Sequence, residues 1–143
     1  MKYSILLSLL LLLIACKKEK EESSPYIGSW EMRDISGTGL VNPNDIKPGN
    51  GNIIKFASDS VYIYVWGELV SRSKYHIAND TCLVCYDQPR IMNRLYMEDE
   101  TEVTPYQGYT YLETQKDTLV KYSYYTNGSN IFERYKFVKV ADR

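Results

Sequence analysis

Short runs of β-branched and aromatic residues, each separated from the next by turn residues, constrain the fold of this chain more than any other feature. Few long segments show the 3.6-residue period of a helix. This pattern is typical of an all-β barrel or sandwich. We expect strands over residues 28–35, 52–56, 60–66, 69–77, 81–86, 91–97, 109–114, 118–125 and 130–140.

The segments between these runs are rich in turn formers. We expect turns at 57–59, 67–68, 78–80, 116–117 and 126–128. Asn127-Gly128 is the strongest signal, because both residues accept the positive φ of a tight hairpin. Consecutive antiparallel strands that close into a barrel leave no exposed edge. The sequence therefore predicts an antiparallel up-and-down barrel of about eight strands.

The first residues have the features of a secretion signal. Lys2 is followed by an apolar stretch, 5–15, which is shorter than the roughly 20 residues of a membrane-spanning helix and fits the core of a signal peptide. Leu13-Ile14-Ala15-Cys16 resembles the lipobox of bacterial lipoproteins, in which cleavage precedes the cysteine and the thiol carries a diacylglycerol. The resemblance predicts a signal peptide at 1–15 and a lipidated Cys16. The alternative is an ordinary signal peptide with an incidental cysteine.

Residues 17–25 are charged or polar and offer nothing to bury, so we expect 16–25 to be the lipidated cysteine and a tether. The run also resembles the acidic signal that follows the cysteine in surface lipoproteins of Bacteroidetes-type bacteria; a generic spacer is the alternative. We expect a lipid anchor in the outer membrane, with the periplasmic side and the cell surface both open. A multiply acylated cysteine anchors stably, whereas a single chain does so only marginally.

The remaining residues, 26–143, are enough for a single domain with a substantial core. The formal net charge is −1 and no basic stripe is present, which argues against nucleic-acid binding. We expect the domain to be a monomer.

Several segments resemble one family. Ile27-Gly28-Ser29-Trp30-Glu31, "PGNGNIIKF", "VYIYVWGELV" and "DTLVKYSYYTNGSNIFERYKFVKV" together are similar to the small lipocalin-like domains of Bacteroidetes lipoproteins. The resemblance covers most of 26–140. It implies that Trp30 packs across the closed end of the barrel. It also implies that a basic residue of the last strand, Arg134 or Lys139, lies over that ring, and Gly28 permits a close approach there.

Catalytic motifs are absent from the sequence. His76 is the only histidine, and neither a phosphate-binding loop nor a nucleophile elbow is present. The acidic run 98–102 lacks the spacing of a calcium loop, so a solvated loop is favoured. We therefore expect no enzyme activity, no cofactor and no metal.

Cys82 and Cys85 allow several chemistries. A secreted location favours a disulfide. In a regular strand, however, residues three apart lie about 10 Å apart on opposite faces, and a disulfide needs Cα atoms within about 7 Å. Either this stretch bends, or both thiols are free. The expected turn at 78–80 would place His76 opposite Cys82 as part of a soft-metal site, which the direction of Cys85 disfavours.

The aromatic residues suggest two functions. Both faces of the run 60–66 are apolar or aromatic; one carries Tyr62, Tyr64 and Trp66, and the other Val61, Ile63 and Val65. If the aromatic face points inward, the barrel binds a small amphipathic or apolar ligand, with Trp66 at the open mouth. If it points outward, a surface interaction module for a glycan or a partner protein takes its place. Plain core packing with half-exposed tyrosines is the alternative to both.

Overall fold

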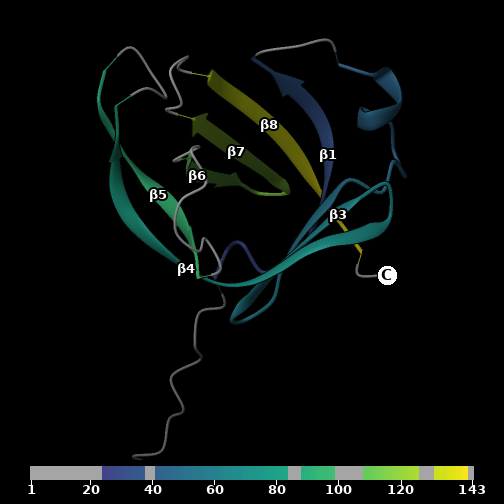
Figure 1. Cartoon of the computed structure of the whole chain (residues 1–143), viewed down its shortest axis with the longest axis horizontal. Helices are drawn as coiled ribbons and strands as arrows, with labels where there is room; N and C mark the ends of the chain where they lie inside the picture. The colour runs from purple at the N-terminus through teal and green to yellow at the C-terminus, as the bar shows by residue number, and fades with distance from the viewer. Residues whose placement is uncertain (1–23, 38–40, 84–87, 99–107, 126–130, 142–143) are drawn as a thin grey trace, which may run out of the picture.

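Eight antiparallel strands form a closed barrel in which each strand pairs with its neighbours in the sequence and β1 also pairs with β8 (Figure 1). The computed structural model describes residues 24–37, 41–83, 88–98, 108–125 and 131–141. The predicted all-β antiparallel barrel is thereby confirmed. The elements are β1 (Gly28–Ser36), the 3₁₀ helix η1 (Pro43–Ile46), β2 (Ile53–Phe56), β3 (Ser60–Val65), β4 (Glu68–Cys82), β5 (Arg90–Met97), β6 (Gly108–Gln115), β7 (Thr118–Tyr125) and β8 (Ile131–Val140).

The predicted turn at 78–80 is wrong, because β4 is a single strand of 15 residues that continues through it. Ala78, Asn79 and Asp80 all pair with β5. Asp80 also forms an ion pair with Arg94 of β5 at 2.8 Å. Cross-strand pairing therefore outweighs the local turn preference of these residues. As a consequence, the predicted strands 69–77 and 81–86 become one strand that ends at Cys82.

The hairpin between β3 and β4 turns one residue earlier than predicted. Its two turn residues are Trp66 and Gly67, with φ of 52° and 88°. Positive φ at both positions is the signature of a type I′ hairpin, in which an aromatic residue is unusual. The turn is held by hydrogen bonds from the Trp66 N–H to the Asn52 side chain (3.1 Å) and from the Gly67 N–H to the carbonyl of Gly51 (3.0 Å).

The barrel core consists of alternate residues of the strands. Successive residues of a strand point to opposite faces. On β6 and β7, for example, Leu112 and Leu119 belong to the interior cluster, whereas Tyr111 and Tyr122 belong to a second cluster on the other face. The interior cluster is Tyr26, Trp30, Ile54, Phe56, Val61, Leu95, Leu112, Leu119 and Phe137.

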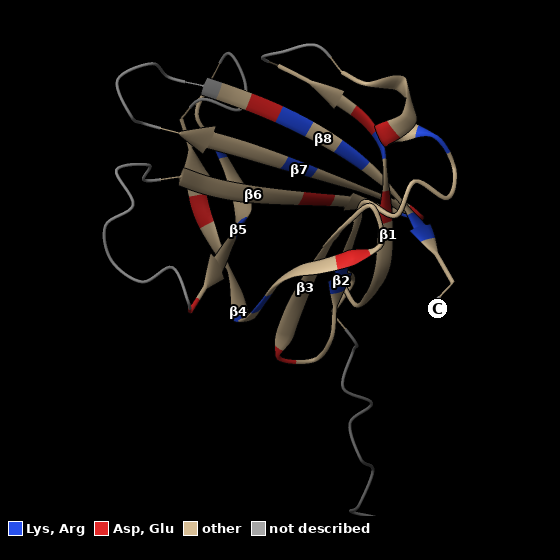
Figure 2. Cartoon of the chain, turned by 45° about the vertical axis from the view of Figure 1, so that its right-hand side comes forward, with Lys and Arg blue, Asp and Glu red and all other residues tan. Residues whose placement is uncertain are grey.

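Charged residues of both signs are interspersed on the barrel. In the view of Figure 2, acidic and basic residues lie close together on β8 and are scattered over the other strands. Within the residues that the structure describes, no helix has the length and apolar character needed to cross a membrane.

Candidate functional site

Trp30 lies at the end of the barrel where β1 begins. It is completely buried, and its Nε1–H donates a hydrogen bond of 2.7 Å to the carbonyl of Tyr26. Of the two basic residues proposed to cover it, Lys139 has its Nζ 5.2 Å from the ring centroid. Arg134 pairs with Tyr122 on the outer face instead. Gly28 has a φ of +124°, and a Cβ at this position would lie 3.0 Å from Cε of Lys139, so the two residues approach closely.

The aromatic face of β3 does not point inward, as the internal-ligand hypothesis required of Tyr62 and Tyr64, although Tyr64 also borders a cavity at one end of the barrel. Val61 pairs with Phe56, and both belong to the interior cluster. Tyr62 is the next residue and points the other way, opposite Lys55 on β2. Tyr64 lies two residues further on, on the same outer face. The register with β2 therefore places the aliphatic residues of β3 on the interior face.

Trp66 lies at the opposite end of the barrel from Trp30, since β3 runs in the same direction as β1 and Trp66 follows its last residue. Its side chain is 71% exposed. The indole Nε1–H donates a hydrogen bond of 3.0 Å to the Asp45 carboxylate of η1. The sequence placed Trp66 on the rim correctly, but as a continuation of a strand rather than as a turn residue.

A cavity of about 290 Å³ opens at this end of the barrel. Its lining is mostly apolar and comes largely from inward-facing side chains of β1, β2, β3, β7 and β8. The rim is formed by the η1 segment and the hairpin. The lining residues are Met32, Asp45, Asn52, Ile53, Ile54, Ile63, Tyr64, Val65, Trp66, Lys121, Tyr135 and Phe137.

The rim is a connected set of hydrogen bonds. Besides its bond to the Trp66 N–H, the Asn52 side chain donates a hydrogen bond of 3.1 Å to the carbonyl of Asp45. The segment between η1 and β2 is fixed from the other side, because the Glu31 carboxylate accepts hydrogen bonds from the N–H groups of Gly49 (3.1 Å) and Gly51 (3.4 Å). The segment after β1 and the hairpin thus hold each other in place around the opening.

The hydrogen bonds that Glu31 accepts favour the ionised form of its carboxyl group. Burial by itself disfavours the charged form, but hydrogen bonds from Gly49, Arg33 and Gly51 outweigh that effect, so the pKa of the Glu31 carboxyl lies below its ordinary value. Arg33 also forms an ion pair with the same carboxylate.

Two polar groups stand in the otherwise apolar wall. The Nζ of Lys121 lies 4.2 Å from the ring centroid of Tyr135, and the Tyr135 hydroxyl donates a hydrogen bond to the Glu133 carboxylate. Burial lowers the pKa of Lys121 to about 8, although the charge of Glu133 acts in the opposite direction. Burial and the bond to Glu133 raise the pKa of the Tyr135 hydroxyl. Sequence reasoning missed this group.

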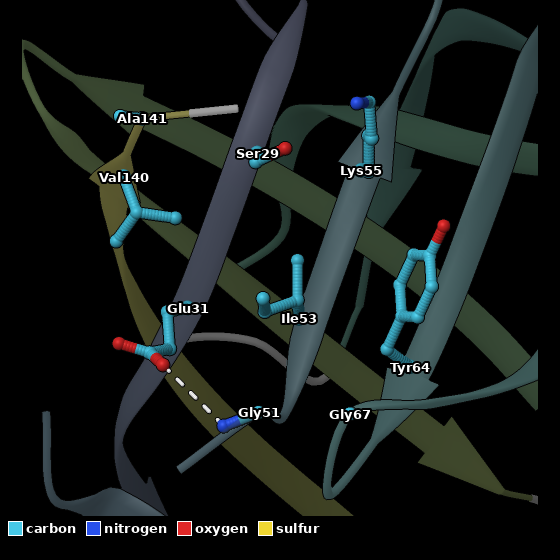
Figure 3. Close-up of a pocket in the computed structure, with 9 residues that line it drawn as sticks. All are labelled: Ser29, Glu31, Gly51, Ile53, Lys55, Tyr64, Gly67, Val140 and Ala141. Atoms are coloured by element: carbon cyan, nitrogen blue, oxygen red, sulfur yellow. Dashed lines mark hydrogen bonds between the residues drawn. The ribbon is translucent and has the colours of Figure 1, made fainter. Parts of the chain in front are cut away.

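A second hollow, of about 320 Å³, lies on the outer face of β1, β2 and β3 (Figure 3). In Figure 3, Lys55 and Tyr64 stand on neighbouring strands, and the dashed line marks the hydrogen bond from Gly51 to Glu31. The hollow is lined by Ser29, Glu31, Gly51, Ile53, Lys55, Tyr64, Gly67, Val140 and Ala141.

The expectations for cysteine and histidine need correction. Cys82 is fully buried and disulfide-bonded, so of the two alternatives left open for Cys82 and Cys85, the one with both thiols free is wrong for Cys82. The regular strand 81–86 on which that expectation depended ends at Cys82. Cys16 and Cys85 both lie outside the described residues.

His76 is not opposite Cys82, as the predicted turn implied. It pairs with Tyr96 of β5, and the two rings stack with centroids 4.6 Å apart. Among the described residues no group of three or more potential metal ligands is found. The acidic run 98–102 lies outside them except for Glu98.

No family model, curated protein or solved structure matches this chain.

Proposed function

We propose that this protein binds a small amphipathic or apolar ligand in the cavity at the Trp66 end of the barrel. The wall of this cavity is formed mainly by other inward-facing residues, among them Met32, Ile54 and Ile63, and not by the aromatic face of 60–66 on which the expectation of an internal ligand depended. The observation that carries the proposal is the cavity itself: about 290 Å³ of mostly apolar space inside the barrel, with an opening bordered by an exposed indole. A pocket with apolar walls and a few placed polar groups is the usual form of a small-molecule site. The barrel works as a monomeric binding protein without catalytic chemistry.

The wider setting of the proposal comes from the sequence. The resemblance to small lipocalin-like domains and the lipobox-like segment before Cys16 support a lipoprotein that is anchored in the outer membrane, on its periplasmic side or at the cell surface. The signal peptide and the tether lie outside the described residues.

Filling the cavity tests the proposal. Ile63→Phe places a larger side chain on the inner face of β3, and Tyr62→Phe is the matched control on the outer face of the same strand. Titration of the purified protein with 1-octanol, followed by amide chemical shifts, should show saturable binding that Ile63→Phe weakens and Tyr62→Phe leaves unchanged. Thermal melts check that both variants fold. Equal binding by both variants would refute an internal site.

A surface interaction module is the second candidate, and the outer hollow of Figure 3 favours it. Tyr64 and Lys55 line the hollow, and nearby Leu69 and Val70 are 52% and 57% exposed. An aromatic ring and a cation beside a hollow are suited to a glycan. Tyr64→Ala should then abolish binding to a glycan array, and Ile63→Phe should not. Absence of glycan binding by the wild-type protein would exclude a glycan as the target of this surface.

A further inference from the structure

We infer that the ligand of the cavity is a small monocarboxylic acid whose carboxylate pairs with the Lys121 ammonium while its apolar tail lies against the aliphatic wall. This inference rests on the proposed function and names the chemical class of the ligand. The inference is based on Lys121, a cationic residue that the strand register places on the inner face of the barrel.

Lys121 points inward because of its position in β7. It is two residues from Leu119, which is fully buried in the interior cluster, so both share one face of the strand. Lys121 pairs with Leu112 of β6 on one side and Tyr135 of β8 on the other, and it lines the cavity. A long cationic side chain therefore lies on the inner face of the barrel, where most other side chains are apolar.

The ammonium of Lys121 has no hydrogen bond or ion pair among the described residues. It lies over the face of the Tyr135 ring, with Nζ 4.2 Å from the centroid. The Tyr135 hydroxyl donates to Glu133 and is thus engaged elsewhere. A buried charge normally needs a hydrogen-bonded partner, because desolvation costs several kcal/mol. The lowered pKa of about 8 expresses this cost. An anion in the cavity would supply the missing partner.

The neighbours of Lys121 restrict the charge of that anion. Glu133 and Tyr135 of β8 face it, Leu112 of β6 is neutral, and Asp45 borders the opening of the cavity. Because the Glu133 carboxylate already interacts with this ammonium, the site can accept at most a single further negative charge. A dianion such as a phosphate monoester would leave charge uncompensated in an apolar wall.

The volume limits the size of the ligand. If each non-hydrogen atom takes roughly 30 Å³, the share of a water molecule in the liquid, about 290 Å³ holds on the order of ten such atoms. Octanoate has this size, and it combines one carboxylate with an unbranched apolar tail.

The test compares three ligands that have the same eight-carbon chain but different head groups. Octanoate, 1-octanol and octylamine are titrated into the purified wild-type protein, Lys121→Met and the control Lys136→Met, at pH 7 and pH 9.5. Lys136 is exposed and lies on the outer face of β8. In the wild type and the control, octanoate should bind at least about tenfold more tightly than octanol at pH 7, since hydrogen bonds to charged groups are stronger than those between neutral groups. The preference should shrink at pH 9.5. In Lys121→Met it should disappear while octanol binding remains.

A measurement on the wild type alone covers the case in which Lys121→Met does not fold. Octanoate should favour the protonated amine, so calorimetry at pH 8 in two buffers of different ionisation enthalpy should show proton uptake on binding. Octanol should show none. If octanol and octanoate bind equally and without proton uptake, the inference is wrong and the proposed function stands. If none of the three probes binds, the proposed function fails and the inference fails with it.

Discussion

Trp30 and Trp66 are the only tryptophans in the chain, and their surroundings differ completely. Trp30 is fully buried and Trp66 is 71% exposed. Trp30→Ala should therefore lower the free energy of unfolding by about 3–5 kcal/mol, as for other large buried aromatics. Trp66→Ala should cost about 1 kcal/mol or less, mainly through the hydrogen bond to Asp45. Urea unfolding measures both. A loss below about 1 kcal/mol for Trp30→Ala would contradict its role as a core residue.

Lys121 should make the stability of the fold depend on alkaline pH. Its pKa is about 8 in the folded protein and near 10.5 when unfolded, so between these values the unfolded chain binds more protons. Stability must therefore rise with pH in this window. We expect a gain on the order of 1–2 kcal/mol from pH 8 to pH 9.5. Above pH 10 the raised pKa of Tyr135 acts in the opposite direction. Denaturant melts should show the gain in the wild type and lose it in Lys121→Met; an equal gain in the variant would assign it to another group.

At the level of elements, the sequence predicted most strands within a residue or two, because turn residues and β-branched runs agree along most of the chain. It failed at 78–80, where Ala78, Asn79 and Asp80 have turn propensity but pair in register with β5. Their partners on β5 are more than ten residues away in the sequence, so a prediction from neighbouring residues does not include them. Tertiary contacts decided this segment.

The candidate site was less predictable than the fold. Both faces of 60–66 are apolar or aromatic, so alternation alone does not indicate which face points inward. The register with β2 settles the question by placing Tyr62 opposite Lys55 on the outer face. The inward position of Lys121 could have been read from the sequence. Lys121 is two residues from Leu119 and so lies on the same face of its strand, and a hairpin around the predicted 126–128 turn would have placed that face inside the barrel.

The junction of the hairpin with the segment before β2 yields a prediction with an internal control. Gly49 and Gly51 both have positive φ, so alanine strains either position, by about 1–2 kcal/mol. At Gly51 a Cβ would also lie 2.5 Å from the Gly67 nitrogen, whereas at Gly49 nothing lies within 4 Å. Gly51→Ala should thus be less stable than Gly49→Ala by roughly a further 1–3 kcal/mol, with altered Trp66 fluorescence as the rim shifts. Identical melting curves for Gly51→Ala and Gly49→Ala would show that the contact between Gly51 and Gly67 adjusts without loss of stability.

In the molecule as a whole, the two ends of the barrel have different roles. Near the start of β1, Trp30 fills the interior and Lys139 lies over it. At the other end, Trp66 and Asp45 border an open cavity. Closure of the sheet between them removes the exposed strand edges that an open meander would present to other chains. The proposal of a small-ligand binding protein depends on this difference between a filled end and an open end.

The proposed attachment of this barrel to a membrane would depend on Cys16. An apolar stretch of 5–15 is too short to span a bilayer, so stable anchoring requires covalent lipid, and more than one acyl chain. Cys16→Ala should abolish labelling by radioactive palmitate and shift the protein to an uncleaved or soluble form in fractionated cells. Cys82→Ala is the matched control: Cys82 is buried and disulfide-bonded, so its loss should reduce stability but leave labelling intact. Palmitate incorporation that persists in Cys16→Ala would place the lipid on another residue, and absence of labelling in the wild type would leave an ordinary secreted barrel.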